Sequence, residues 1–249
     1  MKKTVGILGL GYYGAPLGQA LKASGYEVTG TTTSPEKLEK LAALGLSPHL
    51  LAHPELPSAE LLRKDILVIN IPPFAEQLAW FQNWPWQEST HIIFISSTSV
   101  YEANSGLVYE EDPLNDGHLA HQEKWFQQNF KNLTILRLGG LLGGTRHPGK
   151  SLSGKQNLKS GKSPVNLIHV DDAIGFTEQV IQNQIKHHVF NVVCDEAHSR
   201  KEFYQEFCQR EGLPLPEFSD DETIGKRISN HKLKYVYELK WATVFGTSL

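Results

Sequence analysis

Three glycines near the N-terminus have the spacing that a dinucleotide phosphate needs. The segment Gly9-Leu10-Gly11-Tyr12-Tyr13-Gly14 directly follows an apolar run at 4–8 and opens a helical pattern at 15–24. In such a strand–turn–helix, the first glycine makes the tight turn, the second admits a pyrophosphate, and the third lets helix and strand pack closely. The N–H groups at the helix start then face the phosphates. We predict a dinucleotide site at Gly9, Gly11, Tyr12, Tyr13 and Gly14; the alternative is a glycine turn that binds nothing.

The residues after the second apolar run, at 26–31, bear on the choice of cofactor. Sites for NAD usually place Asp or Glu here to hold the ribose 2′-hydroxyl, but this chain has Thr31, Thr32, Thr33 and Ser34. Hydroxyl groups do not repel a 2′-phosphate, and Lys37 and Lys40 are near enough in sequence to assist. We therefore predict that Thr32, Thr33 and Ser34 bind the adenosine ribose and that NADP(H) is favoured over NAD(H). Ser34 also suits the N-cap of a helix at 35–43, and both roles can hold.

Two further strand ends carry candidate ligand contacts. A buried run at 91–96 leads into Ser96-Ser97-Thr98-Ser99, and Pro72 and Pro73 end the run at 65–71. Because the carboxyl ends of parallel strands line the ligand crevice, Ser97 is placed to hydrogen-bond a substrate oxygen. Pro72 and Pro73 are assigned to the cofactor side. The alternative for the serines is a turn that satisfies its own backbone.

Apolar runs alternate with helical patterns along most of the chain. Strands are expected at 4–8, 26–31, 65–71, 91–96, 133–138 and 189–193, and helices at 15–24, 35–43, 119–130 and 173–185. Continuous apolar strands separated by helices predict a parallel sheet buried on both faces. The predicted class is α/β, a Rossmann-type doubly wound parallel sheet with a small C-terminal substrate lobe.

The later part of the chain changes in composition. Residues 139–144 are rich in glycine and 148–164 are polar, which predicts a loop or lid, and the more charged stretch from Ser199 predicts a small lobe at the C-terminal edge of the sheet. We expect an NAD(P)-binding core at 1–145. A substrate-side lobe at 146–249, interleaved with the last strands and helices of the core, completes a single structural unit.

Composition excludes several classes of protein. The 249 residues are 40% hydrophobic with a formal net charge of -3, so no global basic field attracts nucleic acid or an anionic membrane. Apolar runs are far shorter than the about 20 residues of a membrane span. Two cysteines imply no disulfide framework, and no metal-binding spacing occurs. The lysines and apolar residues at 1–20 loosely resemble a signal peptide but suit a strand and turn better, so we expect a cytoplasmic protein.

Taken together, these motifs resemble the extended short-chain dehydrogenase/reductases, the class of sugar-nucleotide epimerases and dehydratases. The matching segments follow in order over nearly the whole chain: GLGYYG, ISSTSVY, Glu110–Pro113, ILRLGGLLG, Arg146–Pro148, and residues 166–172 and 189–193. The closer resemblance is to an atypical branch called YeeZ-like, on the GxGYxG form, the Pro-Pro at 72–73 and the KRISN segment at 226–230.

The resemblance implies an NAD(P)-binding oxidoreductase, epimerase or dehydratase that acts on a small substrate, with the nucleotide sugars as the model. It gives Ser97 the place of the catalytic Ser/Thr and puts Ser99, Arg146 and His169 towards the substrate. Family members often pair through two helices, one of which corresponds to 118–130, so a homodimer is expected.

The sequence departs from the family at the catalytic base. The family uses Tyr and Lys four residues apart on one helix face, because the ammonium lowers the pKa of the phenol. None of the eight tyrosines here has a lysine four residues later. His118, His121 or Glu123 could substitute, and His118 is our assignment because an imidazole titrates near neutral pH.

Two other functions are alternatives. A catalytically silent NADP(H)-binding module would keep the cofactor site, lack the Tyr–Lys pair and report redox state to a partner. A β-hydroxyacid dehydrogenase would explain GLGYYGAPLGQAL, but it predicts a long, all-helical C-terminal domain with a catalytic lysine. Strand patterns that continue to Val193 in a chain of 249 residues fit this alternative poorly.

Several other residues have structural interpretations. Asp171 or Asp172 is expected to cap the following helix, and Cys194 to be a small buried hydrophobe. Trp80, Trp84 and Trp86 are expected to pack one helix and its loop.

Overall fold

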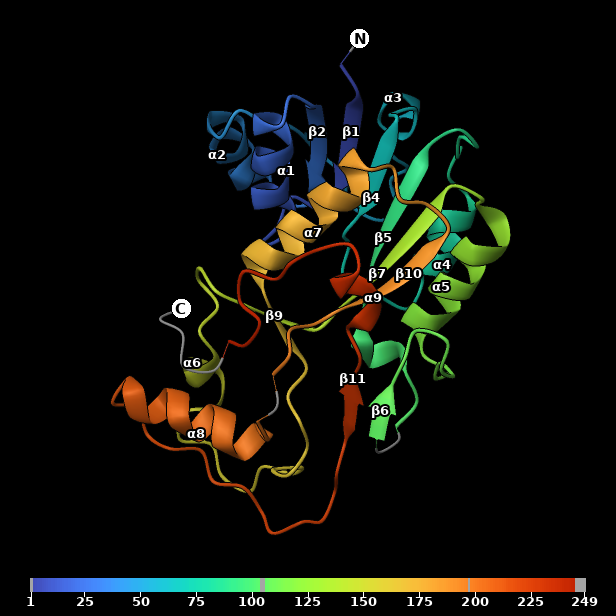
Figure 1. Cartoon of the computed structure of the whole chain (residues 1–249). Helices are drawn as coiled ribbons and strands as arrows, with labels where there is room; N and C mark the ends of the chain where they lie inside the picture. Colours follow the sequence, from blue (N-terminus) through green and yellow to red (C-terminus); the bar gives the residue numbers. More distant parts are fainter. Residues whose placement is uncertain (1, 104–105, 197, 245–249) are drawn as a thin grey trace. The chain divides into compact units, whose positions relative to one another are not determined.

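The computed structural model describes residues 2–103, 106–196 and 198–244 (Figure 1). Seven strands form one sheet in the order β10-β7-β5-β4-β1-β2-β3. Their bounds are Thr4–Leu8 (β1), Glu27–Thr32 (β2), Ser47–Leu50 (β3), Ile66–Ile69 (β4), His91–Ser97 (β5), Leu133–Leu138 (β7) and His188–Val192 (β10). The strand order reverses between β1 and β4, which is the topological switch point of a doubly wound sheet. The predicted Rossmann-type fold is therefore confirmed.

Helices lie on both faces of the sheet. Figure 1 shows α1 (Gly14–Ala23), α2 (Leu38–Ala43) and α7 (Val170–Gln182) together, and α4 (Gln77–Gln82) and α5 (His118–Asn129) on the opposite face. Two shorter helices, η1 (Pro35–Lys37) and α3 (Ala59–Leu62), complete the N-terminal half. Both faces are covered, so strands β4 and β7 are buried at every position.

An aromatic cluster fills the layer between the sheet and helices α4 and α5. Trp80, Phe81, Trp84 and Phe126 are all at most 6% exposed, and the partly buried Trp86 packs against them. Ring centroids lie 4.8 Å apart for Trp80 and Trp84 and 5.4 Å apart for Phe81 and Phe126. The prediction that the tryptophans pack one helix and its loop is confirmed.

The chain divides into two compact units that alternate along the sequence. The first contains residues 1–100, 116–137 and 174–190, and the second contains 101–115, 138–173 and 191–249. The first unit therefore holds the glycine loop and most of the sheet.

The second unit has two short parallel strand pairs and three helices among its described residues. Strand β6 (Gly106–Val108) pairs with β11 (Lys226–Ile228), and β8 (Gly140–Leu142) pairs with β9 (Leu167–His169). The helices are α6 (Pro148–Leu152), α8 (Arg200–Arg210) and α9 (His231–Lys234), and a turn of 3-10 helix, η2 (Thr98–Val100), ends the first unit's β5.

One expectation for this part of the chain is wrong. Residues 139–144 and 148–164 are not a loop or lid throughout, because Gly140 pairs with Leu167 in β8–β9 and α6 begins with the buried Pro148 and Gly149. Nor is the C-terminal part all helical, as a β-hydroxyacid dehydrogenase would require, since β10 joins the central sheet and β11 lies in the second unit.

Within the described ranges, no helix is both long enough and apolar enough to cross a membrane. Cys194 and Cys208 are both buried free thiols, as expected of Cys194.

A buried histidine at the start of β5 should make folding sensitive to acid. The His91 ring is 3% exposed, and its Nε2 lies 2.9 Å from Thr134 Oγ1, which donates to the Ile185 carbonyl. The imidazole Nε2–H therefore donates to Thr134. Burial, together with the charges of Lys186, His187 and Lys3, lowers the pKa of His91 to about 4.

Because the unfolded chain takes up this proton near pH 6.5, the stabilisation is complete above that pH and is lost as pH falls towards 4. We expect a loss of about 2–3 kcal/mol across this window. Urea unfolding at pH 7.5 and 4.5 measures it, with His91→Gln as the control that removes this titration alone. An equal loss in wild type and His91→Gln would contradict the assignment.

Candidate functional site

The carboxyl ends of four neighbouring strands meet at one edge of the first unit. The strand register places Thr31, Leu8, Ile69 and Phe94 at the same level of β2, β1, β4 and β5. The residues that follow each strand therefore share this edge. In a doubly wound sheet this is where ligands bind.

Two of the loop glycines cannot carry a side chain. Gly9 has φ +102°, and a Cβ on it would lie 2.2 Å from the Asn70 carbonyl oxygen. A Cβ on Gly14, the first residue of α1, would lie 2.1 Å from the Gly9 carbonyl oxygen. Both distances are far inside van der Waals contact, so the turn closes only with glycine at these positions.

Gly11 differs from its two neighbours. Its backbone is exposed, and a Cβ placed on it would meet nothing within 4 Å. Packing therefore does not require glycine here. Open space over a backbone amide at the start of a helix fits a pyrophosphate, which needs close approach to the chain.

Side chains from the flanking strands hold the loop in place. Thr31 accepts from the Gly9 N–H at 3.1 Å through its hydroxyl and from the Leu10 N–H at 2.6 Å through its carbonyl. Asn70 Nδ2 donates to the Gly9 carbonyl at 3.1 Å. Sequence reasoning missed Asn70; the only signal was a polar residue at the end of an apolar run.

The two loop tyrosines lie differently. Tyr12 is half-buried, whereas Tyr13 is 3% exposed and its hydroxyl lies 2.5 Å from Thr177 Oγ1 on α7. Burial raises the pKa of Tyr13 well above its usual range. The Tyr13 ring therefore packs α1 against α7, and its backbone borders the loop.

The predicted ribose contacts follow β2. Thr32 is buried, and its hydroxyl accepts from the Ser34 N–H at 3.2 Å. Thr33 is exposed and Ser34 is half-buried. Ser34 occupies the N-cap position of η1 without a side-chain cap bond, so its hydroxyl is not engaged by the helix. Thr33 and Ser34 thus present hydroxyl groups, while Thr32 shapes the turn.

Pro72 and Pro73 are exposed in the loop that follows β4, two residues beyond Asn70. Their rings restrict the backbone of this loop and cannot donate hydrogen bonds.

Ser97 is the last residue of β5 and is half-buried. Its Oγ accepts from the Ser99 N–H at 3.1 Å, so its own proton can be donated to another group. Ser99 is exposed in η2. The Ser/Thr turn that was the alternative interpretation is therefore present, and it orients the Ser97 hydroxyl.

A buried ion pair contacts Ser96, the residue before Ser97. Glu123 on α5 and Arg137 on β7 are 0% and 2% exposed, and Arg137 Nη2 donates to Glu123 Oε2 at 2.6 Å. Arg137 Nε lies 3.1 and 3.0 Å from the two carboxylate oxygens, and Ser96 Oγ donates to Oε1 at 2.5 Å. The Glu123 carboxylate is therefore engaged in structure, which removes it from the candidate bases.

The two histidines at the start of α5 lie on the surface. His118 is the first residue of the helix and is exposed. His121 Nε2 lies 2.6 Å from the exposed Asp116 carboxylate. His118 thus keeps an accessible imidazole, whereas His121 is tied to a neighbouring acid.

In the second unit, the predicted substrate residues lie near one turn. Arg146 is exposed, and its backbone exchanges two hydrogen bonds of 3.1 Å with Gly143. His169 is 7% exposed, and a Cβ on Gly143 would lie 2.3 Å from its Nε2. The Trp241 ring covers it at 3.7 Å between centroids. Burial lowers the pKa of His169, so the ring is neutral at physiological pH.

Asp172 fixes this arrangement in a way that sequence reasoning missed. Its fully buried carboxylate accepts from the Lys240 N–H at 2.8 Å, the Trp241 N–H at 2.9 Å and the Tyr237 hydroxyl at 3.2 Å. Its partners therefore lie in the C-terminal segment, and not in the first turn of α7 that it was expected to cap.

Residues 4–105 match the family model described as the NAD binding domain of 6-phosphogluconate dehydrogenase. This range holds β1 to β5, the glycine loop and Ser97. The first part of the chain is thus an NAD(P)-binding domain.

Comparison over the full length identifies the family. Protein YeeZ of Escherichia coli (strain K12) is 35% identical over an alignment of 247 residues including gaps, with coverage of 90% of this chain and 89% of that protein. A functionally unknown conserved protein from Silicibacter pomeroyi DSS has a similar structure, with a TM-score of 0.80, 23% identity and coverage of 97% and 95% of the two chains. A UDP-glucuronic acid 4-epimerase from Bacillus cereus in complex with NAD shares the fold, with a TM-score of 0.70, 18% identity and coverage of 94% and 92%. The chain therefore belongs to the family of Protein YeeZ, and its first part is an NAD(P)-binding domain.

Proposed function

We propose that the protein is an NAD(P)(H)-dependent oxidoreductase or epimerase/dehydratase-like enzyme that acts on a small substrate of the nucleotide-sugar kind. The observation that carries this proposal is the open space over Gly11, where a Cβ would meet nothing within 4 Å. Thr31 and Asn70 hold the neighbouring Gly9 in place, so the loop leaves room for a pyrophosphate. A bound nicotinamide would supply hydride transfer. The B. cereus epimerase, which shares the fold, was solved with NAD.

We further propose that NADP(H) is the preferred cofactor. The hydroxyl groups of Thr33 and Ser34 stand where a carboxylate would hold the ribose of NAD. The exposed Lys37 and Lys40 follow within one helical turn or two and add positive charge for a 2′-phosphate.

On the substrate side, Ser97 donates a hydrogen bond to the reacting oxygen and His118 transfers the proton. Ser97 suits this role because the Ser99 N–H orients its oxygen and leaves its proton to be donated. His118 suits its role because it is exposed at the first turn of α5. Ser99 and Arg146, both exposed, are the assigned substrate contacts, and His169 shapes that side beneath Trp241.

A second candidate is a catalytically silent NADP(H)-binding module. Two observations favour it: no tyrosine has a lysine four residues later, and the Glu123 carboxylate is bound by Arg137. Such a module would bind NADPH without oxidising it. Incubation with a panel of nucleotide sugars and their keto derivatives separates the two. Absorbance at 340 nm detects an oxidoreductase, and chromatography of the sugar products detects an epimerase or dehydratase, which regenerates its nicotinamide in each turnover; a silent module gives neither signal.

The first test is a titration of the protein with NADPH and NADH, followed by energy transfer from tryptophan to the nicotinamide. We expect micromolar NADPH binding with NADH weaker by about 10-fold or more, a difference of about 1.4 kcal/mol. The Gly11→Val variant should lose binding while its melting temperature stays near that of wild type, because its side chain fills only the open space. Tighter binding of NADH would overturn the cofactor preference, and binding of neither dinucleotide would overturn the proposed function.

A further inference from the structure

A second binding site lies in the second unit, on the ribbon formed by β6 and β11. The register pairs Leu107 with Arg227 and Val108 with Ile228. Val108 and Ile228 are buried at 1% and 5% exposure, whereas Leu107 is 52% exposed and Arg227 is also exposed. The ribbon therefore buries one face and presents the other.

A cavity of about 330 Å³ adjoins this ribbon. Its lining includes Leu107 and Arg227 from the ribbon, Ser229 and Asn230 from the two positions after β11, and Cys194 and Asp195 from the segment after β10. This volume is at the lower end of the range of small-molecule sites, about 300–1,000 Å³. It suits a small metabolite and is too small for a dinucleotide.

Arg227 gives the cavity an uncompensated positive charge. Among the residues that the structure describes, its guanidinium has no hydrogen bond or ion pair. The one carboxylate in the lining, Asp195, is already engaged by Lys234 Nζ at 2.5 Å and by Asn230 Nδ2 at 3.0 Å. Burial raises the pKa of the Cys194 thiol to about 12, so this side chain is neutral and does not oppose an anion.

Hydrogen bonds set the position of the cavity walls without any ligand. Asn166 accepts from the Ile228 N–H at 2.8 Å and donates to the Lys226 carbonyl at 2.9 Å, on either side of Arg227. Asn230 Nδ2 donates to the Val193 carbonyl at 3.0 Å, which ties the ribbon to the segment that holds Cys194. A preorganised wall lowers the entropic cost of binding.

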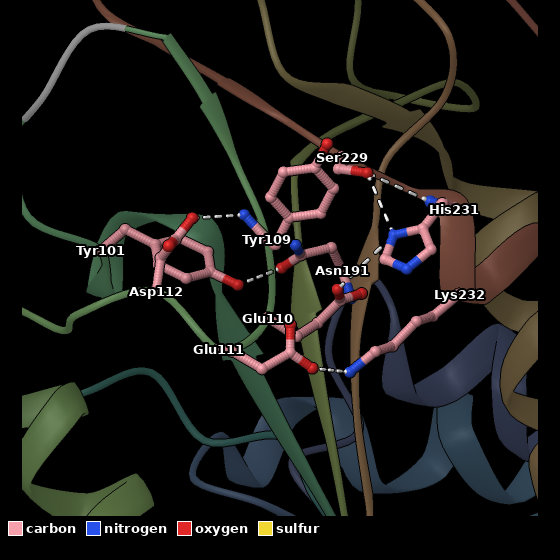
Figure 2. Close-up of polar contacts among 9 residues, drawn as sticks. All are labelled: Tyr101, Tyr109, Glu110, Glu111, Asp112, Asn191, Ser229, His231 and Lys232. Atoms are coloured by element: carbon pink, nitrogen blue, oxygen red, sulfur yellow. Dashed lines mark hydrogen bonds and ion pairs between the residues drawn. The ribbon is translucent and has the colours of Figure 1, made fainter.

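Figure 2 shows the polar contacts that brace the same region. The Tyr101 hydroxyl donates to Asn191 Oδ1 at 2.6 Å, and the Asn191 N–H donates to the buried Glu110 carboxylate at 2.9 Å. Ser229 Oγ lies 3.2 Å from His231 Nδ1, so this hydroxyl is oriented where it borders the cavity. Tyr101 and Glu110 thus tie the segments on either side of β6 to β10.

We propose that this cavity binds a small organic anion, a phosphate monoester or a carboxylate, through the Arg227 guanidinium with the Ser229 hydroxyl beside it. The planar fork of arginine matches both kinds of anion bidentately. This site uses none of the residues assigned to the dinucleotide, so it is tested without cofactor.

The experiment is calorimetric titration of the full chain, without dinucleotide, using inorganic phosphate, glucose 6-phosphate and malate as separate probes. We expect at least one probe to bind with one-to-one stoichiometry, and the glucose 6-phosphate and malate arms to distinguish phosphate from carboxylate. Arg227→Gln should weaken binding by about 10- to 100-fold, the range for a lost charge-assisted pair. Arg227→Lys, which keeps the charge but not the fork, should lie between Arg227→Gln and wild type.

Two matched variants separate this site from other anion sites. Arg63→Gln makes the same change at an exposed arginine of the first unit and should bind as wild type does. Gly11→Val should also bind these probes normally, because the dinucleotide loop is not involved. The proposal is overturned if no probe binds at about 10 mM. It is also overturned if Arg227→Gln weakens binding no more than Arg63→Gln does, or if Gly11→Val abolishes it. Melting temperatures of all variants check that each is folded.

Discussion

Replacing Arg137 with methionine is expected to lower the free energy of unfolding by about 3–5 kcal/mol. The Glu123 carboxylate is fully buried, and Arg137 donates to both of its oxygens at distances of 2.6–3.1 Å. Removing the guanidinium leaves a buried carboxylate whose remaining neutral partner is the Ser96 hydroxyl. The cost is that of an uncompensated buried charge, which far exceeds the net value of the pair itself.

Chemical denaturation of wild type and three variants measures this effect. The double variant Glu123→Leu with Arg137→Met should recover most of the loss, because an apolar pair of similar volume needs no solvation. Arg210→Met is the matched control: its Nε lies 2.6 Å from Glu206 on α8, where both side chains are partly exposed, so we expect a loss of about 0.5 kcal/mol or less. If Arg137→Met costs no more than Arg210→Met, the pair is not desolvated as the structure indicates.

Arg137→Met should also reduce the order of the candidate active site. Ser96 binds Glu123 directly and precedes Ser97, so the ion pair positions the end of β5. Arg137→Met should therefore lower the activity of the candidate site around Ser97, even under conditions in which the protein remains folded.

Replacing Gly14 with alanine is expected to be the most damaging small change in the dinucleotide loop. The new Cβ would lie 2.1 Å from the Gly9 carbonyl oxygen and 3.2 Å from Asn70 Nδ2. These are the two groups that hydrogen-bond each other at 3.1 Å to close the turn. We expect a loss of about 3 kcal/mol of stability, at the upper end for overpacking. We also expect NADPH affinity to fall by about 100-fold, because the displaced backbone can no longer donate to the phosphates.

Gly11→Ala provides the control, since its Cβ would meet nothing within 4 Å. Thermal unfolding should show Gly11→Ala within about 0.5 kcal/mol of wild type and Gly14→Ala well below it. NADPH titration of both variants then distinguishes two effects: displacement of the loop backbone by Gly14→Ala, and filling of the open space above the loop by Gly11→Ala. Equal melting temperatures for the two variants would contradict the close packing of Gly14 against Gly9.

Local sequence patterns were enough to predict the central sheet and its cofactor loop. The runs at 4–8 and 133–138 match β1 and β7 at both ends, and α1 and α5 begin and end within one residue of the expected bounds. Continuous apolar runs identify buried parallel strands because both faces must avoid water. Gly9, Gly11 and Gly14 were likewise found from their spacing alone, since turn chemistry depends on neighbouring residues.

Short and polar elements escaped prediction. Strand β3 reads Ser-Pro-His-Leu and has no buried position, so no apolar run marks it; only its pairing with β2 makes it a strand. Helix α8 is charged, and its clearest signal was the capping box of Ser199 and Glu202, which the compositional interpretation of this part of the chain overlooked.

The sequence by itself determined the fold class, the family resemblance and the position of the dinucleotide loop. Only the tertiary structure decided which polar side chains support the site. Asn70 is 61 positions from Gly9, Asp172 is 69 from Trp241, and Asn166 is 62 from Ile228. The partners of a buried polar group are set by which strand ends and segments the fold brings together, and no local pattern encodes such pairings. The same reason explains why Glu123, a plausible base in the sequence, is an ion-pair partner of Arg137 in the structure, and why the Arg227 cavity became visible only there.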